Sequence, residues 1–183
     1  GAVTLGSATT SDTNSTNSNR ADITIAAITG GSNALTLTTE NNVTGSDVTA
    51  SGAISGVTTL SLADIGGTAT LSGDVDVTSL IVGAVSNSVA NLVFTGNGST
   101  ITNAFVPFND GALILGTDGG TQTFNGGINT FSKPAGAITL NGTIQSSNDV
   151  LAFVDVTLAS DTIIDTNATD STGAILISTI IGG

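Results

Sequence analysis

The sequence predicts an all-β fold, a parallel β-helix in which residues 1–183 form one repetitive domain. Three observations predict it. Helix-favouring Glu, Lys, Gln, Arg and Met are nearly absent, whereas the β-branched residues Thr, Val and Ile abound. Short apolar runs alternate with stretches rich in Gly, Asn and Asp. A degenerate phrase, Gly-Ala-(Ile/Val/Leu)-Xaa-(Leu/Ile), also returns along the chain.

The expected strands are short runs in which apolar residues alternate with Thr or Ser, as on a half-buried strand, or follow one another, as on a buried one. Ile23-Thr24-Ile25 is an example of the first kind and residues 112–115 of the second. The expected strands cover residues 2–5, 22–25, 34–37, 59–62, 69–71, 79–82, 91–94, 112–115, 137–140, 154–158 and 174–177.

Turns are expected where Gly follows Gly, Asn or Asp, because these residues adopt positive φ at little cost. Such pairs occur at residues 30–31, 66–67, 97–98, 110–111, 118–120 and 126–127. Residues 6–20 are nearly all Ser, Thr, Asn and Asp, which predicts an exposed polar loop.

The recurring phrase begins at Gly1, Gly111, Gly136 and Gly173, and looser copies fill the intervals. A period of about 22 residues predicts roughly eight coils stacked about 4.8 Å apart. The alternative is a β-sandwich, which also has short strands every 8–12 residues. Such a sandwich is typical of a pilus-like fibre subunit that polymerises when a terminal strand completes a neighbour's sheet.

The composition excludes several classes of function. Two cations stand against 14 acids, giving a net charge of -12, so we expect no nucleic-acid partner and no docking on anionic lipid. The chain contains no run of 18 apolar residues, so no membrane insertion is expected. Without His or Cys there is neither a Cys/His zinc site nor a His-based catalytic relay. We therefore expect a protein that is not an enzyme.

The repeated phrases at residues 121–126, 136–142 and 158–162 resemble the repeat regions of filamentous haemagglutinin-like giant adhesins. That resemblance implies secretion by a two-partner route, a right-handed β-helical shaft, and an adhesive role at the cell surface. The expected function is thus a structural or adhesive segment of an extracellular fibre, with host or neighbouring-cell surfaces as further partners. The family's amino-terminal secretion domain is not recognisable, so the resemblance implies shaft and not export signal.

Two groups of acids are candidate sites. Asp161, Asp165 and Asp170, with Asn167, supply hard oxygen ligands suited to calcium. The alternative, which we favour, is that they form turns and solvate the surface, since neither an EF-hand loop nor a Gly-Gly-Xaa-Gly-Xaa-Asp repeat is present. Asp74 and Asp76 alternate along one predicted strand, as a glycosidase pair could, but solvated acids on a strand face are common.

The last residues are apolar and uncharged, and they lack the Pro or Lys that blocks strand edges. The first strand, residues 2–5, likewise has no charged residue and no Pro. We expect the tail, residues 174–181, to be ordered and to pair with chain outside this unit, either copies of itself or further chain of the same protein. The alternative is that the tail folds back on its own sheet. The expected assembly residues are Ala174, Ile175, Leu176, Ile177, Ile180 and Ile181.

Overall fold

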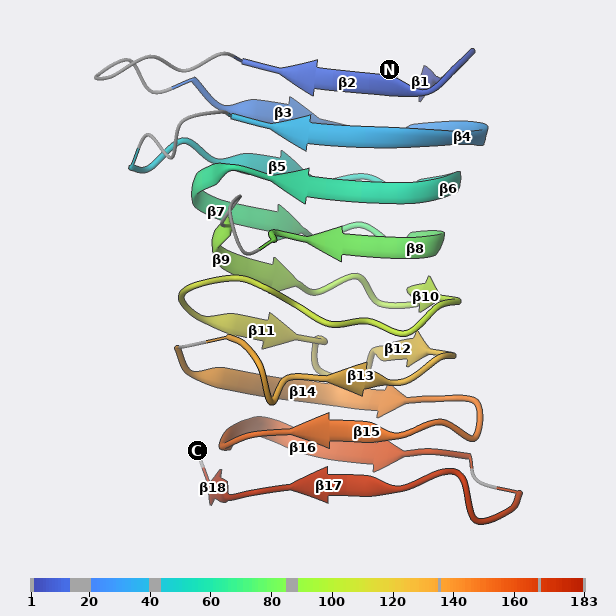
Figure 1. The fold of residues 1–183 in the computed structure, drawn as a ribbon, viewed down its shortest axis with the longest axis vertical. Coiled ribbons are helices and arrows are strands. Elements are labelled where there is room, and N and C mark those ends of the chain that lie inside the picture. Colours follow the sequence, from blue (N-terminus) through green and yellow to red (C-terminus); the bar gives the residue numbers. More distant parts are fainter. Residues whose placement is uncertain are drawn as a thin grey trace.

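The computed structural model describes residues 2–13, 21–39, 44–84, 89–134, 136–167 and 169–182. The regular secondary structure within these ranges consists of β-strands alone, and all paired strands run parallel. The strands stack as successive coils from the N-terminal to the C-terminal end (Figure 1). The predicted right-handed parallel β-helix is confirmed, with about seven turns where about eight were expected. A β-sandwich is excluded, because it needs antiparallel strands in two facing sheets.

Each coil has three sides, which we number in chain order from the N-terminal coil. Side 1 contains β1 (Val3–Thr4), the first parts of β4 (Ile28–Thr38), β6 (Ile54–Ala63) and β8 (Val75–Val82), then β10 (Thr100–Ile101), β12 (Thr121–Phe124), and the last parts of β14 (Ile138–Gln145) and β16 (Val156–Asp165).

Side 2 contains β2 (Thr9–Asp12), the second parts of β4, β6 and β8, then β13 (Ile128–Asn129), β15 (Leu151–Phe153) and β17 (Ile175–Ile177). Side 3 contains β3 (Ile23–Ile25), β5 (Val48–Ala50), β7 (Ile65–Leu71), β9 (Val89–Phe94), β11 (Leu113–Leu115), the first parts of β14 and β16, and β18 (Ile180–Gly182).

Glycines at positive φ let one long strand turn from one side to the next. Gly56 (φ 65°) bends β6 between sides 1 and 2, and Gly142 (φ 66°) bends β14 between sides 3 and 1. The register shifts at both places. A Cβ at Gly142 would overlap the carbonyl oxygens of Thr117 and Gly120 in the coil before, so only glycine fits there.

Alternate side chains point inward and stack in columns, one residue from each coil. On side 1, Ile28 pairs with Ile54 and Ile54 with Val75, and all three are buried. The columns of the three sides meet in one hydrophobic core that runs through the coils. Because parallel strands stack in register, an apolar residue at a fixed coil position is covered by its counterparts above and below.

Phenylalanines form an aromatic cluster in the core of the middle coils. The ring of Phe124 stacks on Phe105, with centroids 5.5 Å apart, and meets Phe94 edge-on at 6.2 Å. All three side chains are fully buried. These rings fill a cross-section that Leu, Ile and Val fill elsewhere.

Each expected strand overlaps an observed one, although residues 154 and 155, expected in a strand, precede β16. Five further strands, β5, β10, β12, β13 and β15, were not expected. Another difference lies near the N-terminus. Residues 9–12, expected as part of an exposed loop, form β2 and pair with residues 35–38 of β4. Their polar side chains fit a strand because β4 supplies the ladder partners for their backbone. Residues 14–20 lie outside the described residues. The Gly30-Gly31 pair, expected as a turn, is a bend within β4. The Gly66-Gly67 pair, also expected as a turn, lies within β7, where the register with β9 shifts.

Candidate functional site: the two end faces

The C-terminal face is the last coil, formed by β17, β18 and the end of β16. β17 pairs with β15, and β18 with β16; neither has a second ladder partner among the described residues. Ile180 lies in register with Val156, which is fully buried, yet Ile180 is 57% exposed because no coil covers it. The same holds for Ile175, in register with the buried Leu151. Within the described residues, the ladders of sides 2 and 3 thus end at β17 and β18.

The predicted assembly residues are brought together on this face. Ile175, Ile177 and Ile180 continue inward columns, whereas Leu176 and Ile181 alternate with them and point outward. Ala174 precedes β17, and its carbonyl accepts a hydrogen bond of 2.9 Å from the Leu151 amide. β17 and β18 pair with β15 and β16 of the same chain. The expected pairing of residues 174–181 with chain outside this unit stays a prediction.

The N-terminal face is hollow. A cavity of about 530 Å³ opens there, and Val3, Leu5, Leu35 and Leu37 are among the side chains that line it. On side 2 the inward positions of this coil carry Thr9 and Ser11, which the register places over Leu35 and Leu37. The sequence indicated that the first strand lacks edge-blocking residues. It did not predict this hollow, because the residues of β2 were expected to form a loop.

The acids proposed for calcium do not converge. Asp161 and Asp165 are four residues apart along β16, about 13 Å in a strand. Asp165 accepts a hydrogen bond of 2.8 Å from the amide of Asn167, which is a turn contact. Across the described residues, no group of three or more acidic side chains is positioned to hold a metal ion.

Asp170 has a different local role. Its carboxylate accepts hydrogen bonds from the hydroxyl and amide of Thr172 and from the Asn148 side chain in the coil before. These contacts, with the Thr172 hydroxyl as the largest cause, hold the pKa of Asp170 below its ordinary value. The arrangement ties two turns together, so the interpretation of these acids as turn-forming residues is the one the contacts favour.

Asp74 directly precedes β8, and Asp76 is the second residue of that strand. Asp74 accepts a hydrogen bond of 2.8 Å from the Gly98 amide in the next coil. Asp76 points outward into a shallow groove of about 260 Å³, lined mainly by hydroxyl-bearing residues such as Thr78 and Thr100. Asp76 is the one carboxylate among the described residues of that lining.

A ladder of side-chain oxygens along side 3 was not foreseen. Asp22 accepts from the amide of Asp47 (2.9 Å), and Asp47 accepts from the amide of Thr68 (2.7 Å). Two coils further on, Asn91 accepts from the amide of Ala112 at 2.9 Å. The composition could have indicated this ladder, because 13 of the 14 acids are Asp. The short side chain of Asp reaches the amide of the adjacent coil.

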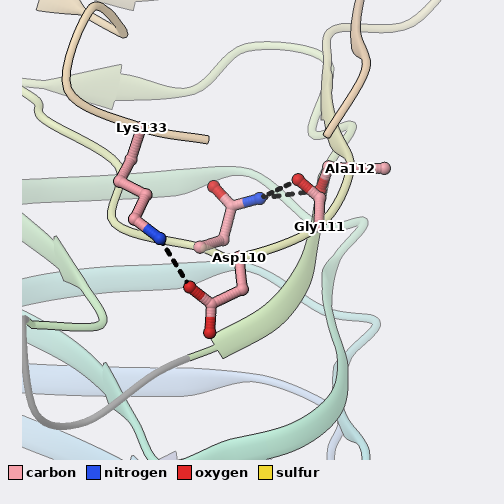
Figure 2. A network of polar contacts seen from close by, with 5 residues as sticks. Asp110, Gly111, Ala112 and Lys133 are labelled. Carbon is pink, nitrogen blue, oxygen red and sulfur yellow. Dashed lines mark hydrogen bonds and ion pairs between the residues drawn. The ribbon is translucent and has the colours of Figure 1, made fainter. Parts of the chain in front are cut away.

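Lys133 forms an ion pair with Asp110 of the preceding coil, with Nζ and Oδ1 2.7 Å apart (Figure 2). In the same network the backbone carbonyls of Gly111 and Ala112 accept from a buried side chain, Nδ2 of Asn109. Asp110 is exposed and Lys133 is partly exposed, so the ion pair contributes little to stability.

The stacked parallel coils define the class of the protein as a β-solenoid. In comparisons with known proteins, no family model, no curated protein and no solved structure matched the chain. Within the described ranges there is no helix of the length and apolarity that crossing a bilayer requires.

Proposed function

We propose that this chain is a non-catalytic structural segment of an extracellular surface fibre or giant adhesin. The observation that carries the proposal is the continuous parallel ladder, in which every coil adds length while the core columns continue from coil to coil. In a solenoid of this kind each coil contacts only its neighbours, so every added coil lengthens the rod. Its partners are copies of itself or further chain of the same protein, and surfaces of host or neighbouring cells.

The exterior supports the proposal. Outward positions carry Thr, Ser, Asn and Asp, as in the side 3 column that contains Thr24, Thr49 and Thr70. A net charge of -12 keeps such rods apart from one another and from anionic lipid. Uncharged hydroxyl side chains on a strand surface need no particular pH or ion to remain hydrated.

The location is tested by labelling. Antibodies raised against the 183-residue chain should label the surface of intact cells of the source organism, or fibres in its medium. Labelling that appears only after the cells are opened would contradict the extracellular assignment.

The non-catalytic assignment needs its own test. The purified chain, incubated with acidic and neutral polysaccharides, should release no new reducing or unsaturated ends. Turnover that disappears in Asp74→Asn or Asp76→Asn would assign the groove beside Asp76 an enzymatic role. That result would contradict the non-catalytic assignment.

A further inference from the structure

We propose that the groove beside Asp76 binds neutral glycans, the uncharged sugar chains that an adhesive segment would meet on a cell surface. This inference rests on the proposed adhesive function and names the ligand class and the binding site. The groove lies at the corner between sides 1 and 2, and four successive coils contribute to it, from Ser32 in the first to Thr100 and Thr102 in the fourth.

The groove lies where the corner loses residues from one coil to the next. Between the positions paired on either side of it, β4 has residues 30–32, β6 has Gly56 alone, and β8 has no residue. The corner therefore narrows step by step beside the wider first coil. Ser32 lines this end of the groove with a φ of 62°, a conformation that is uncommon for residues other than glycine. Residues held in this way cluster at ligand sites.

Two columns of outward polar side chains border the groove. Thr58, Thr78 and Thr102 occupy one position in three successive coils, as the register of the paired strands and the backbone hydrogen bond of Thr102 require. In the second column Asp76 pairs with Thr100. Because adjacent coils are about 4.8 Å apart, hydroxyl groups repeat along the groove at that spacing. A chain of sugars, which carries hydroxyls on every unit, can contact several of them at once.

The floor between the two columns is apolar. Val57 and Val77 line it while their side chains point inward, and they are only 2% and 4% exposed. Gly56 adds no side chain there. Binding sites for small molecules combine such an apolar surface with a few placed polar groups. A sugar ring suits this arrangement, because its faces carry C–H groups and its edges carry hydroxyls.

The dimensions favour an extended ligand. The groove has a volume of about 260 Å³. Pockets that enclose a drug-sized molecule have about 300–1,000 Å³, so a ligand here lies along the groove and keeps one side in solvent. Three steps between coils give a length of about 14 Å, which a short oligosaccharide can follow.

The chemistry of the lining selects a neutral, hydroxyl-rich ligand. The Asp76 carboxylate only accepts hydrogen bonds, whereas threonine and sugar hydroxyls both donate and accept. The described lining residues include no cation, and a net charge of -12 repels acidic glycans. One carboxylate supplies too few hard ligands for calcium. The strands here are paired with a coil on each side, so a peptide cannot be added as a further strand.

The test titrates the whole 183-residue chain, isotope-labelled at its Thr and Val methyl groups, with neutral tetrasaccharides of glucose, mannose, galactose or N-acetylglucosamine. We expect at least one of them to cause saturable NMR shifts at Thr78, Thr100 and Val77. The dissociation constant should be roughly millimolar, because the groove contacts only one side of the ligand. A tetramer of galacturonate, which is acidic, should cause no saturable shift.

Single substitutions locate the contacts. Thr100→Val keeps the shape of the side chain and removes its hydroxyl, so affinity should fall about threefold to tenfold. Asp76→Asn removes the charged acceptor and should weaken binding about tenfold. The matched controls are Thr70→Val, on the outward column of side 3, and Asp118→Asn, at an exposed turn outside the groove. Both should bind like the unchanged chain. Circular dichroism checks the fold, and Thr78→Val replaces either groove variant that unfolds.

The outcomes separate this site from the alternatives. The inference is overturned if no neutral tetrasaccharide binds at tens of millimolar, or if the control variants lose as much affinity as the groove variants. A tetramer of glucosamine that binds while no neutral one does would identify a site for ammonium groups and overturn it too. A chain that labels the cell surface but binds no glycan contradicts the groove assignment alone. A chain that binds a glycan but is found only inside cells contradicts the extracellular function alone.

Discussion

Oδ1 of Asp47 accepts a hydrogen bond of 2.7 Å from the backbone amide of Thr68 in the next coil. The amide of Asp47 in turn donates to Asp22 of the coil before. A carboxylate bond to a backbone amide is stronger than a neutral one. The backbone hydrogen bonds of the ladder hold the sides of adjacent coils together. The Asp side chain holds adjacent coils together at the corner, where it bonds to a backbone amide.

Replacing Asp47 tests this role. Asp47→Ala should lower the free energy of unfolding by about 1.5–3 kcal/mol, the usual contribution of a hydrogen bond to a charged group. Asp47→Asn keeps an acceptor at the same reach and should cost less, while Asp47→Glu displaces the oxygen. Hydrogen exchange of the Thr68 amide is the local measurement; unchanged protection in Asp47→Ala would show that the bond contributes nothing.

The aromatic cluster should be the most sensitive part of the core. Phe124→Ala removes a fully buried ring that contacts Phe94 and Phe105, so we expect a loss of about 3–5 kcal/mol in urea unfolding. Phe131→Ala is the control, because Phe131 is 51% exposed. It should cost less than about 0.5 kcal/mol. Equal losses in the two variants would contradict the assignment of Phe124 to the core.

At Gly142, where β14 bends, no residue other than glycine should be tolerated. Gly142→Ala introduces a Cβ at φ 66° and places it against the carbonyl oxygens of Thr117 and Gly120. Gly119→Ala has a similar φ of 69° but open space around the added carbon. The control should cost about 1 kcal/mol for backbone strain alone. Gly142→Ala should cost clearly more in thermal unfolding; a smaller loss than in Gly119→Ala would show that the coils separate easily.

Asp64 provides a pH-dependent prediction. Partial burial raises the pKa of Asp64 above its ordinary value of 3.8, so folding favours the protonated form. The contribution of this group to stability is therefore greatest below pH 3.8 and declines as pH rises through the folded-state pKa. Asp64→Asn, which tolerates the φ of 50°, should stabilise the fold at pH 7 by up to about 0.5 kcal/mol. The gain should vanish below pH 3.8; a gain that grows on acidification would contradict the assignment.

Calcium should have little effect on this fold. Asp161 and Asp165 are too far apart along β16 to share one ion, and Asp170 is engaged by Thr172 and Asn148. The expected shift of the thermal midpoint on adding millimolar calcium is below about 1 °C, matched by an equal concentration of magnesium. A calcium-specific rise that is lost in Asp170→Asn would restore the calcium hypothesis.

Most of the strand positions could be predicted because they depend on local chemistry. Runs such as residues 22–25 and 35–37 alternate apolar and polar side chains, and this alternation is what a strand with one buried face requires. Residues 9–12 could not be predicted, since nothing in Thr-Thr-Ser-Asp distinguishes a strand from a loop until β4 lies beside it. Gln122 is similar: a polar residue that the coil turns inward, where its Nε2 donates to the Phe94 carbonyl at 2.7 Å.

The sequence by itself determined that the chain would be all-β, repetitive, acidic and without a His- or Cys-based site, because these properties follow from which residues are present and how often they recur. The tertiary structure decided which residues share a column, since a column is set by the lengths of intervening bends, and these vary from coil to coil. It also decided that Ile175 and Ile180 continue two core columns in the last described coil, while Thr9 and Ser11 border a hollow in the first. Local preference selects the strand; only stacking against the previous coil determines what each strand covers and what it leaves exposed.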